Sequence, residues 1–225
     1  MAIPFDIPEF DISTIDAIII SHGHLDHCGL VPYIYKMGYK GPVYMTAPTR
    51  DIASLLALDF IGVAYKQAAA PIFNSTDVKE MVKHSVCLNF NEVTDITPDL
   101  RITMYNSGHA LGSAMIHINI GNGSHNLLYT ADLKYSKTRL LDPAITEFPR
   151  LETMTLESTY GGRMDIQPPG REQDEKLAQV IKETISRGGK VLMPVLGSGK
   201  AQDVMVILER MSRIGEIGKI PVYVD

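Results

Sequence analysis

The residues best suited to chemistry lie in the segment 21–27, which reads Ser-His-Gly-His-Leu-Asp-His and directly follows the apolar run 16–20. The segment contains three histidines and an aspartate: His22, His24, Asp26 and His27. Neutral imidazole and carboxylate are ligands that borderline divalent cations such as zinc prefer. A strand that ends in a tight, glycine-containing loop can turn all four side chains into one cavity. Clustered ligands carry more information than single ones, so this segment predicts a metal site rather than a solvated loop.

Two further residues are candidates to complete such a site. His109 lies in the loop 106–113, where the neighbouring glycines allow the backbone to approach another group closely. Asp132 follows the predicted strand 126–130. Each residue alone fits a structural role equally well. Together with the segment 21–27, they supply one more imidazole and a carboxylate that can bridge two metals.

The elements that must position these residues alternate between strands and helices. We predict strands at 16–20, 42–45, 101–105, 114–120, 126–130, 150–157, 190–193 and 221–224, and helices at 30–37, 48–59, 78–84, 177–185 and 204–211. The turn Gly-Asn-Gly at 121–123 predicts a hairpin, and Ser75 or Thr76 is expected to cap the third helix. Strand–helix–strand alternation in the last third favours parallel pairing and an α/β fold.

The other histidines and both cysteines are predicted to have no catalytic role. Structural or solvated positions are expected for His84, His117 and His125. Cys28 follows a candidate ligand directly, but we predict a small buried thiol on the next helix. With Cys87 as the only other cysteine there is no disulfide framework, so a cytoplasmic location is expected.

Composition limits the remaining possibilities. The 225 residues, 45% of them hydrophobic, are enough for one large domain or two modest ones. The longest apolar candidate, 52–65, is interrupted by Asp59, so no membrane partner is expected, and residues 1–10 lack the pattern of a secretory signal. The net charge of -5 argues against a surface built for non-specific nucleic-acid binding, but it allows a locally basic groove.

The segment 197–200, Gly-Ser-Gly-Lys, is similar to the end of a phosphate-binding P-loop. That motif also requires glycine at position 194 and serine or threonine at position 201, where this chain has Pro194 and Ala201. A nucleoside triphosphate site is therefore not expected. A helix N-terminus behind glycines can still hold one phosphate of a polymer.

These motifs together resemble those of the β-CASP nucleases, a branch of the metallo-β-lactamase superfamily, and most of all the archaeal cleavage and polyadenylation specificity factor homologues. The matching segments are SHGHLDHCG, SGHALGSA, the strand ending in Asp132, LESTYGG and PVLGSGKAQD. The resemblance implies a metallo-β-lactamase αββα sandwich over residues 1–161, lacking N-terminal strands. The start of a β-CASP α/β domain with parallel strands is then expected over residues 162–225.

The resemblance also implies a role for each matching residue. The first zinc ion would be held by His22, His24 and His109, the second by Asp26 and His27, and Asp132 would bridge the two. The predicted catalytic residues are Asp26 and Glu157, and Glu157 would support a catalytic histidine supplied from elsewhere. Candidate contacts to RNA phosphates are Arg163, Arg171 and Lys200, each of which also fits a solvated surface role.

Family members begin with strands before the first metal motif and carry two further histidines, one a ligand of the second ion and one a proposed general acid. No histidine follows His125 in this chain. We therefore expect a chain truncated at both ends, with an incomplete second site and weak or absent nuclease activity. A sheet edge left open would invite association between copies, so a homo-oligomer is a further expectation.

The function expected from the resemblance is zinc-dependent cleavage of phosphodiester bonds in single-stranded RNA, of the type that processes mRNA 3′ ends. Two alternatives stay open. One is a small-molecule hydrolase of the same superfamily, such as a thioesterase. The other is a non-catalytic RNA-binding or scaffold subunit.

Overall fold

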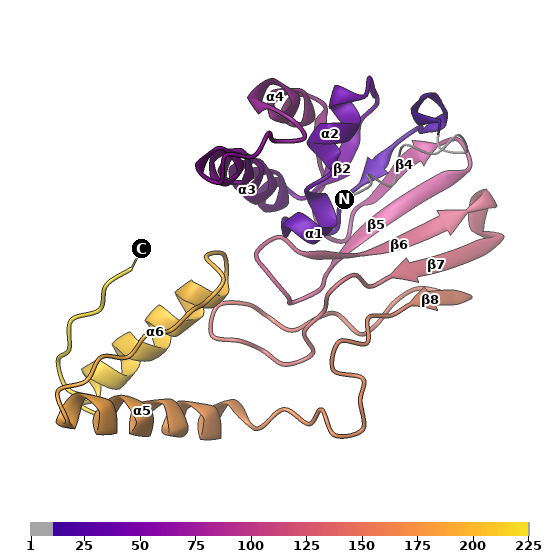
Figure 1. Cartoon of the computed structure of the whole chain (residues 1–225). Coiled ribbons are helices and arrows are strands. Elements are labelled where there is room, and N and C mark those ends of the chain that lie inside the picture. Colours follow the sequence, from indigo (N-terminus) through magenta and orange to yellow (C-terminus); the bar gives the residue numbers. More distant parts are fainter. Residues whose placement is uncertain (1–10, 225) are drawn as a thin grey trace. The chain divides into compact units, whose positions relative to one another are not determined.

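A computed structural model describes residues 11–224, and the segment 1–10, which lacks a secretory-signal pattern, lies outside them. The chain divides into two compact units (Figure 1). The first unit comprises Met1–Lys137 and Leu141–Glu157, and the second comprises Thr138–Leu140 and Ser158–Asp225. The predicted mixture of helices and strands is present, and the α/β class is confirmed.

The first unit starts with a small parallel sheet and its crossover helices. The strands, in spatial order, are β1 (Ile18–Ile19), β2 (Val43–Met45) and β3 (Ser85–Cys87). The helices are α1 (Leu25–Cys28), α2 (Val31–Lys36), α3 (Ala47–Lys66) and α4 (Ser75–Lys83). A short 3-10 helix, Ile12–Thr14, precedes β1. Parallel strands cannot be joined by tight turns, so helices make each connection.

A second sheet of five strands follows in the same unit. Its strands, again in spatial order, are β4 (Val93–Thr97), β5 (Leu100–Asn106), β6 (Ala114–Ile120), β7 (His125–Tyr129) and β8 (Thr153–Thr155). β4 to β7 run antiparallel, and β8 pairs parallel with β7. The predicted hairpin between β6 and β7 is confirmed, with a 3-10 turn at Gly121–Gly123.

Side chains on β2 show how the layers of the first unit are held together. Val43 and Met45 are fully buried in a cluster with residues of the helices, whereas Tyr44 between them packs with Met104 and its neighbours in the second sheet. Successive side chains of a strand point to opposite faces, so one strand joins both layers. The result is a helical layer, a three-stranded sheet and a five-stranded sheet, in that order (Figure 1).

The cap of α4 differs from the prediction. The helix starts at Ser75, and its cap is Asn74 rather than Ser75 or Thr76. The Asn74 side chain accepts a hydrogen bond from the Thr76 amide, and Asp77 accepts one from the Asn74 amide. This reciprocal capping box satisfies amide groups at the helix start that Ser75 cannot reach from inside the helix.

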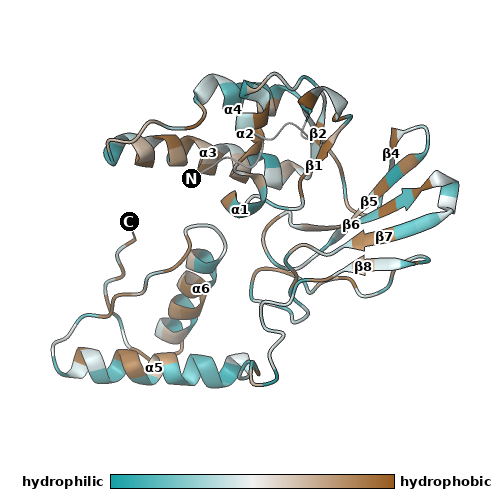
Figure 2. Cartoon of the chain, turned by 45° about the vertical axis from the view of Figure 1, so that its right-hand side comes forward, coloured by the Kyte–Doolittle hydropathy of each residue, from teal (hydrophilic) through white to brown (hydrophobic). Residues whose placement is uncertain are grey.

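The second unit is built on two helices, α5 (Gly170–Ser186) and α6 (Lys200–Arg213). Their apolar faces, visible in Figure 2, meet in a cluster formed by Ala178, Ile181, Leu208, Met211 and Ile217. Asp174 is also buried, and it forms ion pairs with Arg139 and Arg210. The amphipathic patterns at 177–185 and 204–211 therefore did predict the contacting faces.

Two predicted strands are not formed. Segments 190–193 and 221–224 have no strand partner within residues 11–224, and Leu192 and Tyr223 are 91% and 90% exposed. An apolar, β-branched run has strand propensity, but a strand exists only where a neighbour pairs with it. For the same reason the predicted strand 150–157 is reduced to the three residues of β8, and 16–20 to the two residues of β1.

The α3 helix is longer than the predicted range 48–59, because it continues to Lys66. None of the helices between residues 11 and 224 is both long and apolar enough to cross a membrane. The division into domains at residues 161 and 162 remains a prediction.

Candidate metal centre

The first ligand loop leaves β1 and enters α1. The Ile20 amide donates to the Tyr44 carbonyl at 2.9 Å, so the chain stays beside β2 as far as Ile20, and it bends at Ser21. Gly23 then lies directly on α3, where an added Cβ would come within 2.8 Å of Ile52 Cγ2. His24 is the N-cap residue of α1, which places the next two candidate ligands on the first turn of that helix.

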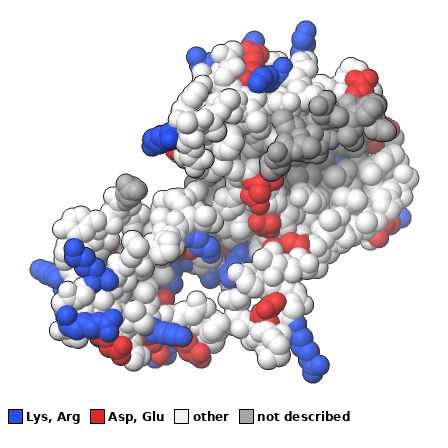
Figure 3. Space-filling view, viewed as in Figure 1, with Lys and Arg blue, Asp and Glu red and all other residues white. Residues whose placement is uncertain are grey.

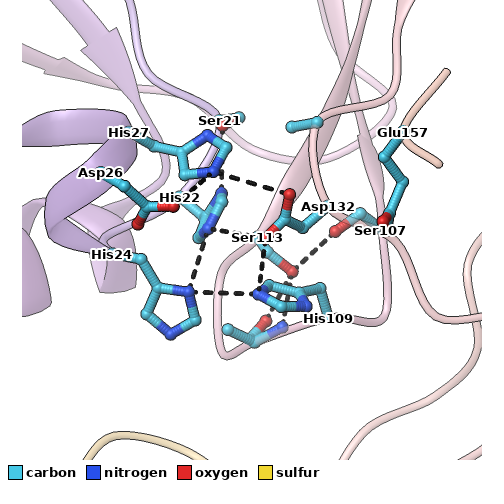
Figure 4. Close-up of polar contacts among 12 residues, drawn as sticks. Ser21, His22, His24, Asp26, His27, Ser107, His109, Ser113, Asp132 and Glu157 are labelled. Carbon is cyan, nitrogen blue, oxygen red and sulfur yellow. Dashed lines mark hydrogen bonds and ion pairs between the residues drawn. The ribbon is translucent and has the colours of Figure 1, made fainter. Parts of the chain in front are cut away.

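The second ligand loop connects β5 to β6 and carries His109. Its base is closed by a hydrogen bond from the Ser107 amide to the Ser113 carbonyl, at 3.1 Å. Gly108 and Gly112 have φ angles of +68° and +77°, a left-handed conformation that side chains other than glycine rarely adopt. The glycines thus allow a tight loop that turns His109 toward the first loop (Figure 4).

Asp132 follows the end of β7. The chain turns at Ala131, whose φ of 46° is uncommon for a residue with a side chain. After the turn, the Lys134 amide donates to the Ser107 carbonyl at 2.8 Å. This bond ties the Asp132 segment to the loop that carries His109.

Four of the predicted ligands converge on one point (Figure 4). One ligand atom from each of His22, His24, His109 and Asp132 lies within 4.8 Å of all the others. His24 Nδ1 is 3.1 Å from both His22 Nε2 and His109 Nε2, and Asp132 Oδ2 is 3.4 Å from His109 Nε2 and 3.8 Å from His22 Nε2.

The three shorter of these separations are close to those between the ligands of one tetrahedral ion. Ligand atoms at about 2.0–2.1 Å from a central zinc lie about 3.3–3.4 Å apart. A single His24 Nδ1 cannot satisfy two imidazole nitrogens by hydrogen bonding, since it carries either one proton or one lone pair. A cation at the centre accounts for three imidazoles and a carboxylate that face each other. The residues present therefore fit a metal.

The electrostatics of His22 suit a metal ligand. Burial, followed by the neighbouring histidines, lowers the pKa of His22 to about 3, so the ring is neutral at physiological pH. Ser21 Oγ lies 3.1 Å from His22 Nδ1. With the proton on Nδ1 and held by this hydroxyl, the Nε2 lone pair faces the other ligands.

Asp26 and His27 form a second, looser group. His27 Nε2 lies 3.3 Å from Asp26 Oδ2 and 3.6 Å from Asp132 Oδ1. The Asp26 side chain is 78% exposed. Asp132 therefore presents one oxygen to the first group and the other oxygen to the second, an arrangement suited to bridging two ions.

Glu157 lies beside the ligands rather than among them. Its Oε1 accepts a hydrogen bond from the Leu133 amide at 2.8 Å, one residue beyond Asp132. Its own amide donates to Thr130 Oγ1 at 3.3 Å. The carboxylate thus holds the segment that carries Asp132.

The three candidate RNA contacts all belong to the second unit. Arg163 is exposed, and Arg171 is exposed and pairs with Glu175 one turn later on α5, at 2.9 Å. Lys200 is the first residue of α6 and follows the left-handed Gly199, whose φ is 85°. Contact with RNA remains a prediction for each of them.

The three histidines and the cysteine expected to be structural each contact a backbone or hydroxyl group outside the ligand cluster. His84 Nδ1 lies 2.9 Å from the Glu80 carbonyl at the end of α4, His117 lies 3.2 Å from the Arg150 carbonyl, and His125 lies 3.0 Å from Thr153 Oγ1. Cys28 is buried on α1, donates to the Gly23 carbonyl, and burial raises its pKa to about 12. A thiol with that pKa is a poor metal ligand, because metals bind the thiolate.

Sequence reasoning missed a set of buried hydroxyl groups around the ligands: Ser21, Thr46, Thr49, Ser107 and Ser113. The sequence position of three of them was an available signal, because Ser21, Ser107 and Ser113 lie in the same short segments as the predicted ligands. Ser and Thr are usually exposed, so composition alone gave no reason to place them inside.

Comparison with known proteins gives consistent results. Residues 5–157 match the model of a metallo-beta-lactamase superfamily domain. The chain is 50% identical over 220 residues to the transcription termination factor FttA of Methanothermobacter thermautotrophicus, and 49% identical over 221 residues to the FttA of Lokiarchaeum. The FttA of Pyrococcus horikoshii is 50% identical over 226 residues. Each match covers 98% of this chain and 35% of the relative, so the chain spans about a third of the length of these relatives.

Proposed function

The chain belongs to the metallo-beta-lactamase superfamily, and we propose that its metal centre is a zinc site for the hydrolysis of phosphodiester bonds in single-stranded RNA. The observation that carries this proposal is the convergence of His22, His24, His109 and Asp132. Three imidazoles with one carboxylate are a donor set that zinc prefers. In this proposal they hold the first ion.

We further propose that the site takes two ions, of the kind used in two-metal hydrolysis. The two oxygens of Asp132 face different groups, which supports a bridging role. Asp26 and His27 would hold the second ion. Zinc bound at such a site supplies Lewis-acid polarisation of a phosphoryl oxygen and lowers the pKa of water.

The protein side chains have separate tasks in this proposal. Ser21 keeps the proton of His22 on Nδ1 and so orients Nε2. Asp26 is exposed beside His27, and its carboxylate has two oxygens, so one would hold the second ion while the other orients a water as general base. Glu157 keeps Asp132 in place through the Leu133 amide.

RNA is the substrate class that the relatives favour. They are named transcription termination factors, and termination acts where an RNA chain is being made. On the face seen in Figure 3, many Lys and Arg side chains lie over α5 and α6, with acidic residues among them. Arg163, Arg171 and Lys200 are the candidate phosphate contacts. A cytoplasmic location is proposed from the two free cysteines.

The test is carried out on the purified 225-residue chain, prepared without chelators. Elemental analysis should find zinc, and a labelled single-stranded RNA should bind with an affinity that falls as salt rises, because phosphate contacts release counterions. Prolonged incubation at high protein concentration should give metal-dependent cleavage. His24→Ala should remove both the zinc and the cleavage.

Two results would contradict the proposal. A chain that contains no metal, and takes up none from added zinc, would exclude the zinc site. Turnover of a lactam or a thioester, with RNA neither bound nor cleaved, would assign the site to small molecules instead.

A further inference from the structure

Both ligand loops rest on the same part of α3. The segment 46–53, its N-cap and first two turns, is called the α3 platform below. An added Cβ on Gly23 would lie 2.8 Å from Ile52 Cγ2, and one on Gly112 would lie 2.6 Å from Thr46 Oγ1. Glycine at these two positions therefore lets the backbone of each loop touch the platform.

Two threonines of the platform hold the second loop directly. The hydroxyl groups of Thr46 and Thr49 both donate to the Gly112 carbonyl, at 2.7 and 3.1 Å, and their oxygens are 2.9 Å apart. Both threonines are buried. The loop belongs to no strand or helix there, so side chains satisfy its partly buried carbonyl.

The rest of the loop is fixed by a second pair of buried hydroxyl groups. Ser113 Oγ accepts hydrogen bonds from Ser107 Oγ at 2.8 Å and from the Ala110 amide at 2.9 Å, and it lies 2.8 Å from the Ala110 carbonyl. Ala110 directly follows His109. A displacement of Gly112 would therefore be passed through Ser113 to the residue beside the ligand.

A further hydrogen bond joins the first ligand loop to the end of the second. The Ala114 amide donates to the Ser21 carbonyl at 2.8 Å, next to His22. The loop that carries His109 is thus anchored at one point on the platform and at another on the segment that carries the other histidines. Between these two anchors, His109 Nε2 lies 3.1 Å from His24 Nδ1.

Stability is one reason for these threonines, because Thr46 caps α3 and together they supply the donors to the Gly112 carbonyl. A metal site has a narrower requirement, because its ligands must be held within about 0.5 Å of their productive geometry.

We propose that Thr46 and Thr49 are positioning residues of the metal centre, which fix the Gly112 carbonyl and thereby set His109 against His22 and His24. This inference rests on the proposed zinc site. It assigns to the start of α3, which contributes no ligand, control over the affinity and geometry of the first ion.

The test compares three forms of the chain: the wild type, Thr46→Val/Thr49→Val, and Thr46→Ser/Thr49→Ser. Valine keeps the shape of threonine without the hydroxyl, whereas serine keeps the hydroxyl and the cap of α3. Zinc affinity is measured by competition with a chromophoric chelator. The visible spectrum of the cobalt(II) form reports ligand geometry, and thermal unfolding without metal reports stability.

The valine pair should bind zinc about 10- to 100-fold more weakly, as expected for loss of outer-shell partners, and its cobalt spectrum should change. The serine pair should match the wild type in both. Equal zinc affinity and equal spectra in all three forms, with only the unfolding temperature lowered, would overturn the inference and leave the zinc site intact. A wild type that binds no zinc would overturn the proposed function and this inference together.

The single variant Thr49→Val decides the question if the valine pair does not fold. It keeps the Thr46 cap and removes one of the two donors to the Gly112 carbonyl. A several-fold loss of zinc affinity with a changed cobalt spectrum supports the inference. An unchanged affinity and an unchanged spectrum overturn it.

Discussion

The two ligand groups of the proposed metal centre share Asp132 but are held in different ways. In the first group, His22 is fully buried, and hydrogen bonds tie the loop of His109 and its flanks to α3, to Ser21 and to the Asp132 segment. In the second group, Asp26 is mostly exposed and stands with His27 on the four-residue helix α1. Enclosure fixes ligand geometry before the metal arrives, so the first group should bind its ion far more tightly.

The largest effect should follow from removing a ligand of the first group. We expect His24→Ala to weaken binding of the tight zinc ion by more than about 100-fold, because loss of an outer-shell partner alone costs about 10- to 100-fold. Chelator competition measures the change. His125→Ala, which changes a histidine that contacts Thr153 instead, is the matched control and should bind zinc like the wild type. A small loss in His24→Ala would remove the distinction between the two groups.

A smaller effect should follow from changing what orients the first group. Ser21→Ala removes the hydroxyl next to His22 Nδ1 while leaving every ligand in place. The tight zinc ion should then bind about 10- to 100-fold more weakly, since the His22 tautomer is no longer fixed. Ser124→Ala, at an exposed turn serine, is the control. If Ser21→Ala binds zinc normally, the enclosure of the first group does not depend on that hydroxyl.

The sequence predicted the ligands better than what supports them. The family resemblance predicted a shared role for His22, His24, His109 and Asp132, and the structure brings one ligand atom of each within 4.8 Å of the others. The two supporting threonines, Thr46 and Thr49, could not be found in this way. Thr49 and Gly112 lie 63 positions apart, and only the packing of α3 against the loop brings them together.

The same limit explains the errors in the second unit. Helices α5 and α6 were predicted from their amphipathic patterns, because a helix makes its backbone hydrogen bonds within itself. The segments 190–193 and 221–224 have equally clear strand patterns and form no strand in the described part of the chain. A strand depends on a partner elsewhere, which a local pattern does not reveal.

A substitution in the second ligand group should weaken the binding of the second ion only. Asp26→Asn removes the charge of an exposed ligand and leaves the enclosed group untouched. We expect the weaker ion to be bound about 10-fold more weakly, at the lower end of the range for one altered group in a site. Zinc titration followed by calorimetry separates the two ions. Loss of the tight ion in Asp26→Asn would mean that the groups are not independent.

The smallest effect concerns Glu157, which supports Asp132, the residue that both groups share. Glu157 Oε1 accepts a hydrogen bond from the Leu133 amide, beside Asp132, and Glu157→Gln keeps an oxygen that can accept the same bond. A hydrogen bond to a charged group contributes about 1 kcal/mol more than a neutral one, so each zinc affinity should fall by no more than about fivefold. Because Asp132 presents an oxygen to each group, the two ions should weaken by similar factors, unlike in Asp26→Asn. Glu157→Leu, which removes the acceptor, should weaken both further. If Glu157→Gln weakened one ion only, Glu157 would act on a single group, and Asp132 would not join the two.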